Sequence, residues 1–396
     1  MIHILGAPDQ KELTRQMRRI KVDPYGIKIM LPKALAYPVK ISALSNIAAN
    51  ILKQEMLSLG GDVAIARGAL TGKSQKTDCL LIGNLAQFSR LNEKLNRQPF
   101  GLNRLAAGLS AALGNYQKDK FSLELGSHRL NLSRRTNIMG ILNLTPDSFS
   151  ADGLYPSCVD KAVKISANMV KDGADIIDVG GQSSRPGARP VSIKEELARI
   201  VPIIKVLSKR IKAPISIDTY KPEVAKAALD NGAVMVNDIT ALRNPKMAKL
   251  IARYKAAVVL MHMKGNPLTM QKNPAYVSLI DEIIEYLDKA IAIAAGAGID
   301  REKIIVDPGI GFGKALRHNL EILKELRQLK VLGRPILVGP SRKSFIGKIL
   351  NLEPQERVFG SVSSCVLAAE NGADMVRVHD VKAVKQALKI IDRVNK

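Results

Sequence analysis

Eight short apolar segments, each ending in a polar residue and followed by a helical pattern, recur between residues 136 and 396. We expect strands at 138–143, 175–180, 214–219, 234–239, 257–262, 303–308, 335–340 and 375–380. A strand followed by a helix, repeated eight times over a segment of this length, is typical of an α/β fold, the (β/α)8 or TIM barrel. The competing interpretation, an open doubly wound sheet, needs a glycine-rich phosphate turn after its first strand, and GILNLTPDSF contains none.

A short internal repeat supports this count of strands. Gly-Ala followed by Asp or Val and an apolar run begins at Gly173, Gly232 and Gly372. A glycine after a helix favours a left-handed stop, and a strand then begins. The three joints precede the second, fourth and eighth expected strands, which gives about 30 to 35 residues per βα unit, as a barrel requires.

Residues 1–117 differ from the rest and predict a small N-terminal α/β domain, with the barrel domain at 118–396. Candidate strands (IKIML, VAIAR, CLLIGN) alternate with helical stretches, and no chemistry motif stands among them, so the role of this domain stays open. The segment 121–135, FSLELGSHRLNLSRR, predicts a β-hairpin with its turn at Gly126-Ser127. We expect this hairpin to close the N-terminal mouth of the barrel.

Composition excludes several classes of protein. With 46% hydrophobic residues the chain is too apolar for disorder, and its charge-interrupted apolar runs are shorter than the roughly 20 residues that span a bilayer. Three isolated cysteines with no CxxC pair argue against a disulfide framework or a structural zinc site, and they fit a reducing cytoplasm.

The net charge of +24 is spread along the chain, with no run of six basic residues. Stacking surfaces are scarce, because there is no Trp and only 4% of the residues are aromatic, so the sequence argues against a nucleic-acid binder. Attraction of a small polyanionic substrate accounts for the charge equally well. Nucleic-acid binding by residues 1–117 alone remains an alternative.

Every expected strand ends in polar side chains, and in a barrel the chemistry lies where the strands end. These side chains are Asn143, Asp178, Asp218, Asn237, Asp238, His262, Asp307, Ser341, Arg377 and His379. Residues two apart on a strand share a face, so Arg377 and His379 point together. Such a pair needs an anion, either a phosphate group or a neighbouring carboxylate such as Asp380. Asp218, Asp307 and Asn237 suit a heterocycle rich in N–H donors.

Loops at the same mouth add polar groups. QSSRPG (182–187) follows the second strand, SRKS (341–344) the seventh and DPGIGFGK (307–314) the sixth. The last of these fits neither GxGxxG nor the P-loop pattern, and its glycines favour close approach of the backbone to a flat ligand. A lone His262 favours a structural role. With no HxH or HExxH, weak Mg²⁺ binding through Asn143 and substrate phosphates is the reasonable metal chemistry.

Taken together and in order, these segments resemble the dihydropteroate synthases of the folate pathway. The resemblance rests on IMGILNLTPDSFS, GADIIDVGGQSSRPGA, PISIDT, VNDI, MHMKGNP, DPGIGFGK, LVGPSRKSFIG and VRVHDV, and it covers about residues 121–396. It implies an enzyme that condenses 4-aminobenzoate with 6-hydroxymethyl-7,8-dihydropterin diphosphate, giving 7,8-dihydropteroate and diphosphate. It does not account for residues 1–117.

The resemblance also implies roles for individual residues. Asp218, Asn237, Asp307 and Lys343 would bind the pterin, and Asn143 would coordinate Mg²⁺. Arg185, Arg377 and His379 would hold the diphosphate and, with Lys343, form the catalytic set. The residues that would shape the aminobenzoate pocket are Phe149, Ser184, Pro186, Phe312 and Ser344. A homodimer is compatible with an exposed helical face on the barrel.

Some positions depart from the family pattern. Gln182 replaces the usual Glu of the second loop and Ser184 the usual Thr, so a charge is lost beside that loop while the hydroxyl is kept. Two alternatives remain open from the residues: a methyltransferase that passes a methyl group from methyltetrahydrofolate to a corrinoid protein, and a non-catalytic pterin-binding paralogue. The first needs no diphosphate site, so SRKS and Arg377 with His379 argue against it.

Overall fold

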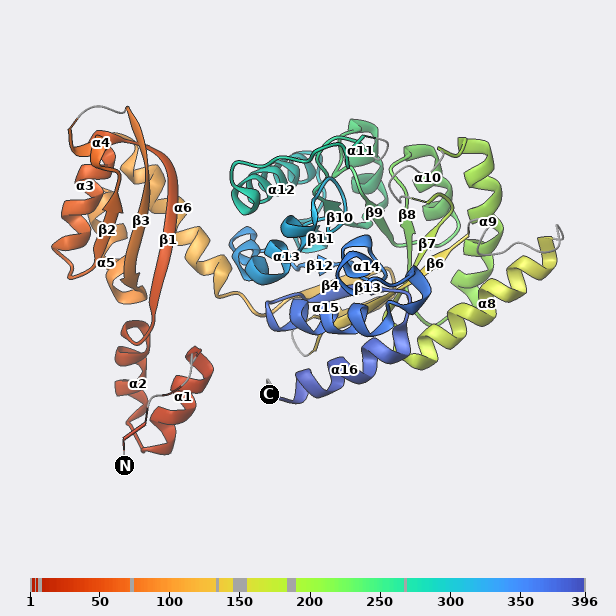
Figure 1. Ribbon diagram of the computed structural model, residues 1–396, viewed down its shortest axis with the longest axis horizontal. Coiled ribbons are helices and arrows are strands. Elements are labelled where there is room, and N and C mark those ends of the chain that lie inside the picture. Colours follow the sequence, from red (N-terminus) through yellow and green to blue (C-terminus); the bar gives the residue numbers. More distant parts are fainter. Residues whose placement is uncertain are drawn as a thin grey trace. The chain divides into compact units, whose positions relative to one another are not determined.

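The computed structural model describes residues 2–3, 5, 9–71, 75–132, 135–144, 155–183, 190–266 and 269–394. The chain divides into two compact units, Met1–Gly114 and Asn115–Lys396 (Figure 1). The division lies close to the boundary expected from the sequence at residue 117.

The first unit is an antiparallel three-stranded sheet in the order β1-β3-β2, covered on one face by helices (Figure 1). Its strands are β1 (Ala36–Ser45), β2 (Asp62–Ile65) and β3 (Lys76–Asn84). Its helices are α1 (Gln10–Arg19), α2 (Pro24–Met30), η1 (Leu31–Lys33), α3 (Asn46–Leu57), α4 (Arg67–Leu70), α5 (Leu85–Leu95) and α6 (Leu102–Tyr116), the last of which runs past Gly114. Strand β3 alternates: Cys79 and Leu81 are buried under α3, α5 and α6, while Leu80 and Ile82 are exposed.

One strand expected in this unit is wrong. IKIML lies in the helical segments α2 and η1, because Pro24 occupies the first turn and Asp23 caps it by accepting from the backbone N–H of Tyr25 at 2.8 Å. The first strand is β1 instead, which the sequence reading did not identify. Strands at VAIAR and CLLIGN are confirmed.

The second unit is a (β/α)8 barrel, and all eight expected strands are confirmed. They are β6 (Asn137–Asn143), β7 (Ile176–Gly180), β8 (Ile215–Asp218), β9 (Met235–Asp238), β10 (Ala257–Met261), β11 (Ile304–Asp307), β12 (Leu337–Val338) and β13 (Met375–Val378). They form one parallel sheet in the order β11-β10-β9-β8-β7-β6-β13-β12. The backbone N–H of Val306 donates to the carbonyl of Pro335 at 2.9 Å, so β11 also meets the start of β12 and the barrel closes.

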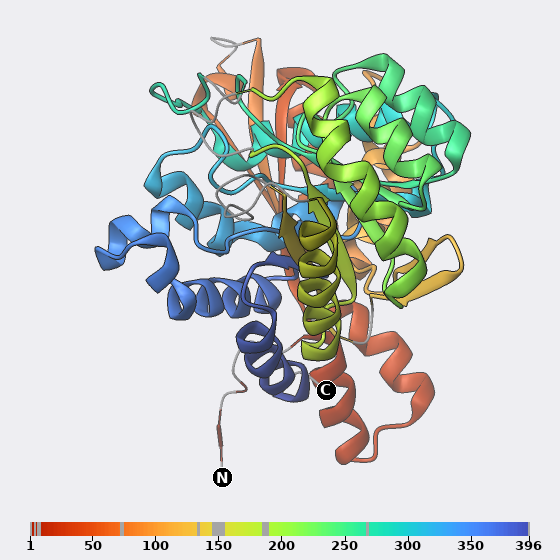
Figure 2. The ribbon, with the colours of Figure 1, turned by 90° about the vertical axis from the view of Figure 1, so that its right-hand side faces the viewer.

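Helices surround these strands, and Figure 2 shows α8 beside α9 and α16 on the outside. They are α8 (Tyr155–Asp172), α9 (Ile193–Arg210), α10 (Pro222–Asp230), α11 (Pro245–Tyr254), α12 (Leu279–Gly296), η2 (Arg301–Lys303), α13 (Leu316–Glu325), η3 (Leu326–Leu332), α14 (Ser344–Leu350), η4 (Pro354–Glu356), α15 (Val358–Glu370) and α16 (Val381–Val394). The joints at Gly173, Gly232 and Gly372 have φ of 109°, 106° and 97°. Residues that carry a side chain rarely adopt such φ values, so these glycines end their helices as expected.

A β-hairpin lies beneath the barrel, as the sequence predicted. It consists of β4 (Ser122–Leu125) and β5 (His128–Asn131), and Gly126 in its turn has φ of 57°. Phe121, Leu123 and Leu125 of this segment pack against apolar side chains at the N-terminal ends of the strands. Those side chains are Met139, Ile176, Met235, Ala257, Ile305, Leu337 and Met375. The hairpin therefore closes the N-terminal mouth.

Strand alternation divides the barrel interior into an apolar floor and a polar top. On β7, Ile177 and Val179 face the core shared with the helices, whereas Ile176 lies in the floor cluster. Asp178, two residues after Ile176, therefore points inward at a higher level. In the described part of the chain, no helix is long and apolar enough to cross a membrane.

Candidate active site

A charged network fills the top of the barrel and is centred on Arg377 of β13. Its Nε donates to Asp178 Oδ2 at 2.6 Å, and its Nη2 donates to Asp218 Oδ2 at 2.7 Å. Asn237 Nδ2 donates to the same Asp178 oxygen at 3.1 Å. Strands β7, β8, β9 and β13 thus bring four polar side chains together, all of them buried or nearly so.

The network answers the question of which carboxylate faces Arg377. Asp380 pairs instead with Arg342, whose Nε donates to it at 2.9 Å. The neighbouring His379 has its Nδ1 3.1 Å from Ser341 Oγ. Arg377 and His379 therefore have different partners, and His379 lies just after the last residue of β13 rather than on the strand.

Burial shapes the ionisation of Asp218. Removal from water raises its pKa to about 7, although the cations Arg377 and Lys343 oppose the rise. The pKa of Asp307 is also raised by burial, against the opposing charge of Lys343. Asp307 Oδ1 accepts from the backbone N–H of Gly309 at 2.6 Å. Both carboxyl groups are thus held close to the cations at this mouth.

Lys343 reaches the same region from the loop after β12. Its Nζ donates to the carbonyl of Ile310 and lies 4.3 Å from the ring centroid of Phe312. Burial lowers its pKa to about 8, and the charge of Asp307 limits the fall. Gly311 is required beneath it, because a Cβ there would lie 2.8 Å from Lys343 Cδ and its φ is 81°.

Asn143 ends β6 at the same mouth and is half-buried. A Cβ built on Gly180 would lie 3.6 Å from Asn143 Oδ1 and 3.8 Å from Asp218 Oδ2, so both oxygens border this glycine. Phe312 belongs to a small apolar cluster with Ile239, Met261, Met263 and Met270, and Ser344 is exposed at the start of α14. Phe149, Ser184, Arg185 and Pro186 lie outside the described residues.

Gln182, the unusual residue of the second loop, is held by hydrogen bonds rather than charge. Lys221 Nζ donates to its Oε1 at 2.7 Å, and its own Nε2 donates to the hydroxyl of Tyr220 at 3.2 Å. Lys221 also pairs with the buried Glu196 at 2.6 Å. The start of this loop therefore has an anchor that keeps its neutral side chain in place.

Sequence reasoning missed two elements of this region. One is Asp178, a strand-end residue to which the sequence assigns no site role, although its alternation with Gly180 on the strand marks it as inward-facing. Lys314 was named only as the end of DPGIGFGK, and its place in the core depends on packing that no local pattern encodes. His262 has the expected structural environment, between Lys314 and the edge of Tyr286.

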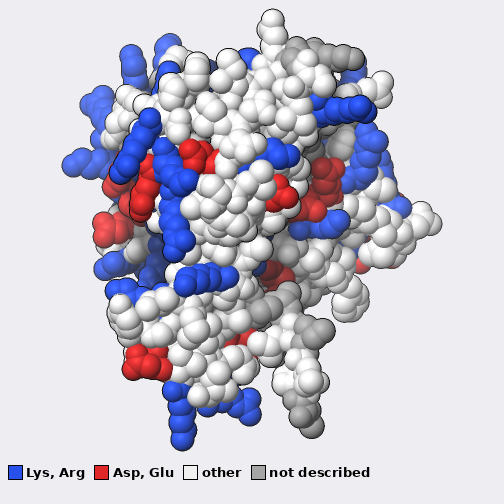
Figure 3. Space-filling model, turned by 90° about the vertical axis from the view of Figure 1, so that its left-hand side faces the viewer, with Lys and Arg blue, Asp and Glu red and all other residues white. Residues whose placement is uncertain are grey.

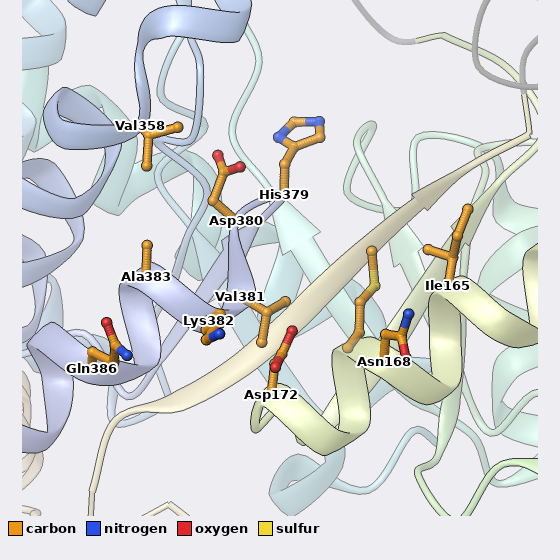
Figure 4. Close-up of a pocket in the computed structure, with 11 residues that line it drawn as sticks. Ile165, Asn168, Asp172, Val358, His379, Asp380, Val381, Lys382, Ala383 and Gln386 are labelled. Carbon is orange, nitrogen blue, oxygen red and sulfur yellow. The ribbon is translucent and has the colours of Figure 1, made fainter.

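A cavity of about 430 Å³ lies between α8 and α16, next to the end of β13 (Figure 4). His379 and Asp380 border it from the strand end, and Asp172 and Asn168 border it from α8. Figure 4 shows that α16 contributes its first turns. The cavity is therefore formed between helices, outside the ring of strands.

Known proteins of one family are similar to this chain in sequence and in fold. The family model described as "Pterin binding enzyme" matches residues 139–379. The dihydropteroate synthase of Synechocystis is 49% identical over 272 residues, which are 68% of this chain and 94% of that protein. The dihydropteroate synthase of Xanthomonas albilineans, solved in complex with 7,8-dihydropteroate, has a TM-score of 0.63 at 40% identity and covers 69% of this chain and 98% of its own.

A third relative extends over the first unit as well. The probable bifunctional folylpolyglutamate synthase/dihydropteroate synthase of Halobacterium salinarum is 38% identical over 377 residues. The match covers 95% of this chain but only 45% of that protein. A segment related to the first unit therefore exists in that longer chain, whereas the Synechocystis match is confined to about two thirds of this one.

Proposed function

Because this chain belongs to the dihydropteroate synthases, we propose that its barrel holds the pterin diphosphate among the strand ends and joins it to 4-aminobenzoate. The product is 7,8-dihydropteroate, and diphosphate leaves. The observation that carries the assignment of the site is the placement of Arg377 between Asp178 and Asp218, with Asn237 on the same carboxylate. Carboxylates and cations stand side by side there, as a heterocycle with an anionic leaving group requires.

We assign the pterin to Asp218, Asn237, Asp307 and Lys343. The two carboxylates and the amide accept and donate along the amino-pyrimidine edge. Because the carboxylates are buried, their charge acts in a medium of low effective dielectric constant and stabilises the positive charge that develops on the pterin. Lys343 donates to the acceptors of the ring and keeps its place through Ile310 and Phe312.

We assign the diphosphate to Arg377 and His379, with Arg185 completing the anion site. The planar guanidinium of an arginine matches phosphate oxygens in a bidentate way. When the methylene C–O bond breaks, its electron pair goes to the diphosphate, and these cations stabilise the charge that accumulates there.

Asn143 is the residue we assign to Mg²⁺. In the described part of the chain no three His, Cys, Asp or Glu side chains are grouped to hold a metal. A single amide oxygen beside Asp218 fits an oxygen-preferring ion held mainly by substrate phosphates. When bound, the ion would neutralise charge on the leaving diphosphate.

The aromatic amine of 4-aminobenzoate attacks the methylene carbon, forms the C–N bond and then loses a proton to solvent. Phe312 offers an apolar wall and Ser344 a hydroxyl at this mouth, and we assign Phe149, Ser184 and Pro186 to the same pocket. Little general-base assistance is needed, because the nitrogen becomes acidic only once it is bonded. Most of the acceleration comes from positioning and electrostatics.

The test is a steady-state assay of diphosphate release and of dihydropteroate formation, with both substrates, with and without Mg²⁺. We expect both products in equal amounts, and a strong dependence on Mg²⁺. Methyl transfer from methyltetrahydrofolate to a corrinoid protein, without diphosphate release, would favour the methyltransferase alternative. Pterin binding with no product would favour the non-catalytic paralogue.

The pH dependence of kcat/KM is expected to be bell-shaped and narrow. Below about pH 7 Asp218 gains a proton and loses its attraction for Arg377, so kcat/KM falls toward acid. Above about pH 8 Lys343 loses its proton, so kcat/KM falls toward alkali. Lys343→Arg should move the alkaline limb upward, since a guanidinium stays charged. A flat profile from pH 6 to 9 would contradict these roles.

Removal of the first unit is expected to leave the reaction intact. A chain beginning at Lys118 keeps the whole barrel and its hairpin, and matching relatives are covered almost completely by this part. We expect its kcat/KM to stay within a factor of about two of the full chain, since a domain with its own core folds alone. If a folded truncated chain loses most of its activity, the first unit contributes to the reaction.

For assembly we propose a homodimer in the cytoplasm. Phe359 of α15 is 85% exposed, and Leu367 and the α14 residues Ile349 and Leu350 are also exposed, so this face offers an apolar surface for a second copy. Sedimentation of the full chain tests it, with Phe359→Glu as the variant that should release monomers. Nucleic acid is not among the proposed partners, because aromatic residues that could stack on bases are scarce. On the face in Figure 3 basic side chains are more prominent than acidic ones, but the two are interspersed with uncharged areas.

A further inference from the structure

The segment 309–313 follows β11, lies against Lys343 and is rich in glycine. Gly309, Gly311 and Gly313 have φ of 70°, 81° and 63°. Glycine adopts such φ values without strain, but it also leaves the backbone free to take up other conformations. A segment that must hold Phe312 in one place therefore needs outside attachments.

Two lysines attach this segment through its carbonyl groups. Lys343 Nζ donates to the carbonyl of Ile310, as described above. Lys314 Nζ donates to the carbonyl of Phe312 at 3.0 Å, and Phe312 in turn lies under the ammonium of Lys343. The two attached carbonyls, of Ile310 and Phe312, lie one on each side of Gly311.

Lys314 is buried among acceptors, with only 3% of its surface exposed. Besides the carbonyl of Phe312, its Nζ meets the carbonyl of His262 at 3.3 Å and His262 Nδ1 at 2.9 Å. An ammonium group has three N–H donors, and three acceptors surround this one. Its position joins the segment after β11 to the end of β10.

Backbone contacts between the same two loops are close. A Cβ on Gly309 would lie 2.0 Å from the carbonyl oxygen of His262, and one on Gly313 would lie 2.6 Å from that of Lys264. The two loops therefore touch without intervening side chains at both ends of the segment. Lys314 fixes the position of one loop relative to the other, because its Nζ donates to the backbone carbonyls of both His262 and Phe312.

Burial of an amine is unfavourable for folding, and burial lowers the pKa of Lys314 well below the usual lysine value. A methionine would fill a similar volume with no polar atom to satisfy. On packing grounds alone, an apolar residue would serve this position at least as well.

We propose that Lys314 is a positioning residue for the arylamine substrate: by binding the carbonyls of Phe312 and His262, it holds the Phe312 ring against which 4-aminobenzoate lies. The inference rests on the proposed function, since it concerns the second substrate of that reaction. Lys314 touches neither substrate. Of the residues assigned to the pterin, Asp218 and Asn237 belong to strands away from this segment, whereas Asp307 and Lys343 are each bonded to it through Gly309 and Ile310.

The test compares Lys314→Met with Lys330→Met in the full chain. Lys330 is a matched control: its side chain is 17% exposed and it bonds Asp119 at 2.6 Å, near the hairpin rather than the site. For Lys314→Met we expect KM for 4-aminobenzoate to rise about tenfold and kcat to fall several-fold, as small displacements of a bound reactant do. KM for the pterin substrate should rise less, by about two- to threefold, because only Asp307 and Lys343 of its four residues are bonded to this segment. Lys330→Met should leave all three constants unchanged.

Two further measurements separate positioning from a merely structural role. The melting temperature of Lys314→Met should fall by only a few degrees, because the acceptors on His262 and Phe312 lose their donor while the cost of burying an amine is removed. Amide hydrogen exchange within 309–313, where the N–H of Gly311 donates to Asn319 Oδ1 at 2.7 Å, should be faster while the rest of the barrel is unchanged. Lys314→Gln, which keeps an N–H donor, should recover part of the loss.

The outcomes are distinct. If the wild type makes no dihydropteroate, the proposed function fails, whatever the variants do. If the wild type is active and Lys314→Met keeps the wild-type KM for 4-aminobenzoate, the inference is wrong. It is equally wrong if Lys314→Met or Lys314→Gln raises both KM values by the same factor, because that pattern belongs to general loss of structure.

Discussion

Arg377→Ala is expected to lower kcat/KM for dihydropteroate formation by about 10² to 10³-fold, or about 2–4 kcal/mol, as loss of one donor to a developing anion does. The guanidinium stands at the top of the barrel with its partners Asp178 and Asp218 already in place, so it costs no reorganisation when charge accumulates on the diphosphate. Single-turnover measurements with saturating pterin diphosphate would assign the loss to the chemical step.

A matched control is Arg334→Ala. Arg334 is also largely buried and bonds the carbonyl of Arg301, but it precedes β12 at the opposite end of the barrel. We expect near-normal kcat/KM for this variant, and circular dichroism should show both proteins folded. Near-normal turnover in Arg377→Ala would remove this residue from the anion site.

Asp178→Ala is expected to lower the free energy of unfolding by about 3–5 kcal/mol, because it leaves the buried Arg377 without its closest partner. The change also removes the acceptor of Asn237, so one deletion disturbs two neighbours. Urea denaturation followed by circular dichroism measures the loss.

The comparison for this variant is Asp160→Ala, which breaks an exposed pair with Arg210 at 3.8 Å. Exposed pairs contribute little, so the urea midpoint should hardly move. A small effect of Asp178→Ala, similar to that of Asp160→Ala, would mean that Asp218 alone satisfies Arg377. The double variant Asp178→Ala with Arg377→Ala, compared with the two single variants, then shows how strongly the two residues are coupled.

The sequence predicted the barrel well because its signals are local. Apolar runs of strand length, glycines at 173, 232 and 372 and the Gly126-Ser127 turn each specify their own element. The IKIML strand failed for the same kind of reason: its apolar run is strand-like, but Asp23 and Pro24 start a helix just before it. The signals that start a helix, Asp23 and Pro24, outweighed the strand-like composition of the residues that follow.

Side-chain partners were harder to predict. Parity on β13 placed Arg377 inward, yet it could not say that Asp178, distant in sequence, would receive its Nε while Asp380 turned to Arg342. The partner that each side chain finds depends on which strands are neighbours in the barrel and on the register between them. The buried amine of Lys314 is a similar case, because its acceptors come from two loops that only the closed barrel brings together.

The role of the first unit could not be predicted, because no residue pattern in it points to chemistry. Its own apolar core shows that it is a true domain, with Leu52, Phe88 and Leu91 fully or nearly fully buried. Its occurrence in the match to the Halobacterium salinarum relative shows that it is not peculiar to this chain.

The hairpin of β4 and β5 has a consequence for how substrates enter the barrel and products leave it. Because Leu123 and Leu125 fill the lower end of the barrel, we expect both reactants to enter, and both products to leave, at the opposite end, where the strands finish. If the pterin lies among the strand ends and 4-aminobenzoate among the loops, as proposed, the pterin diphosphate sits farther in, and we expect it to bind first.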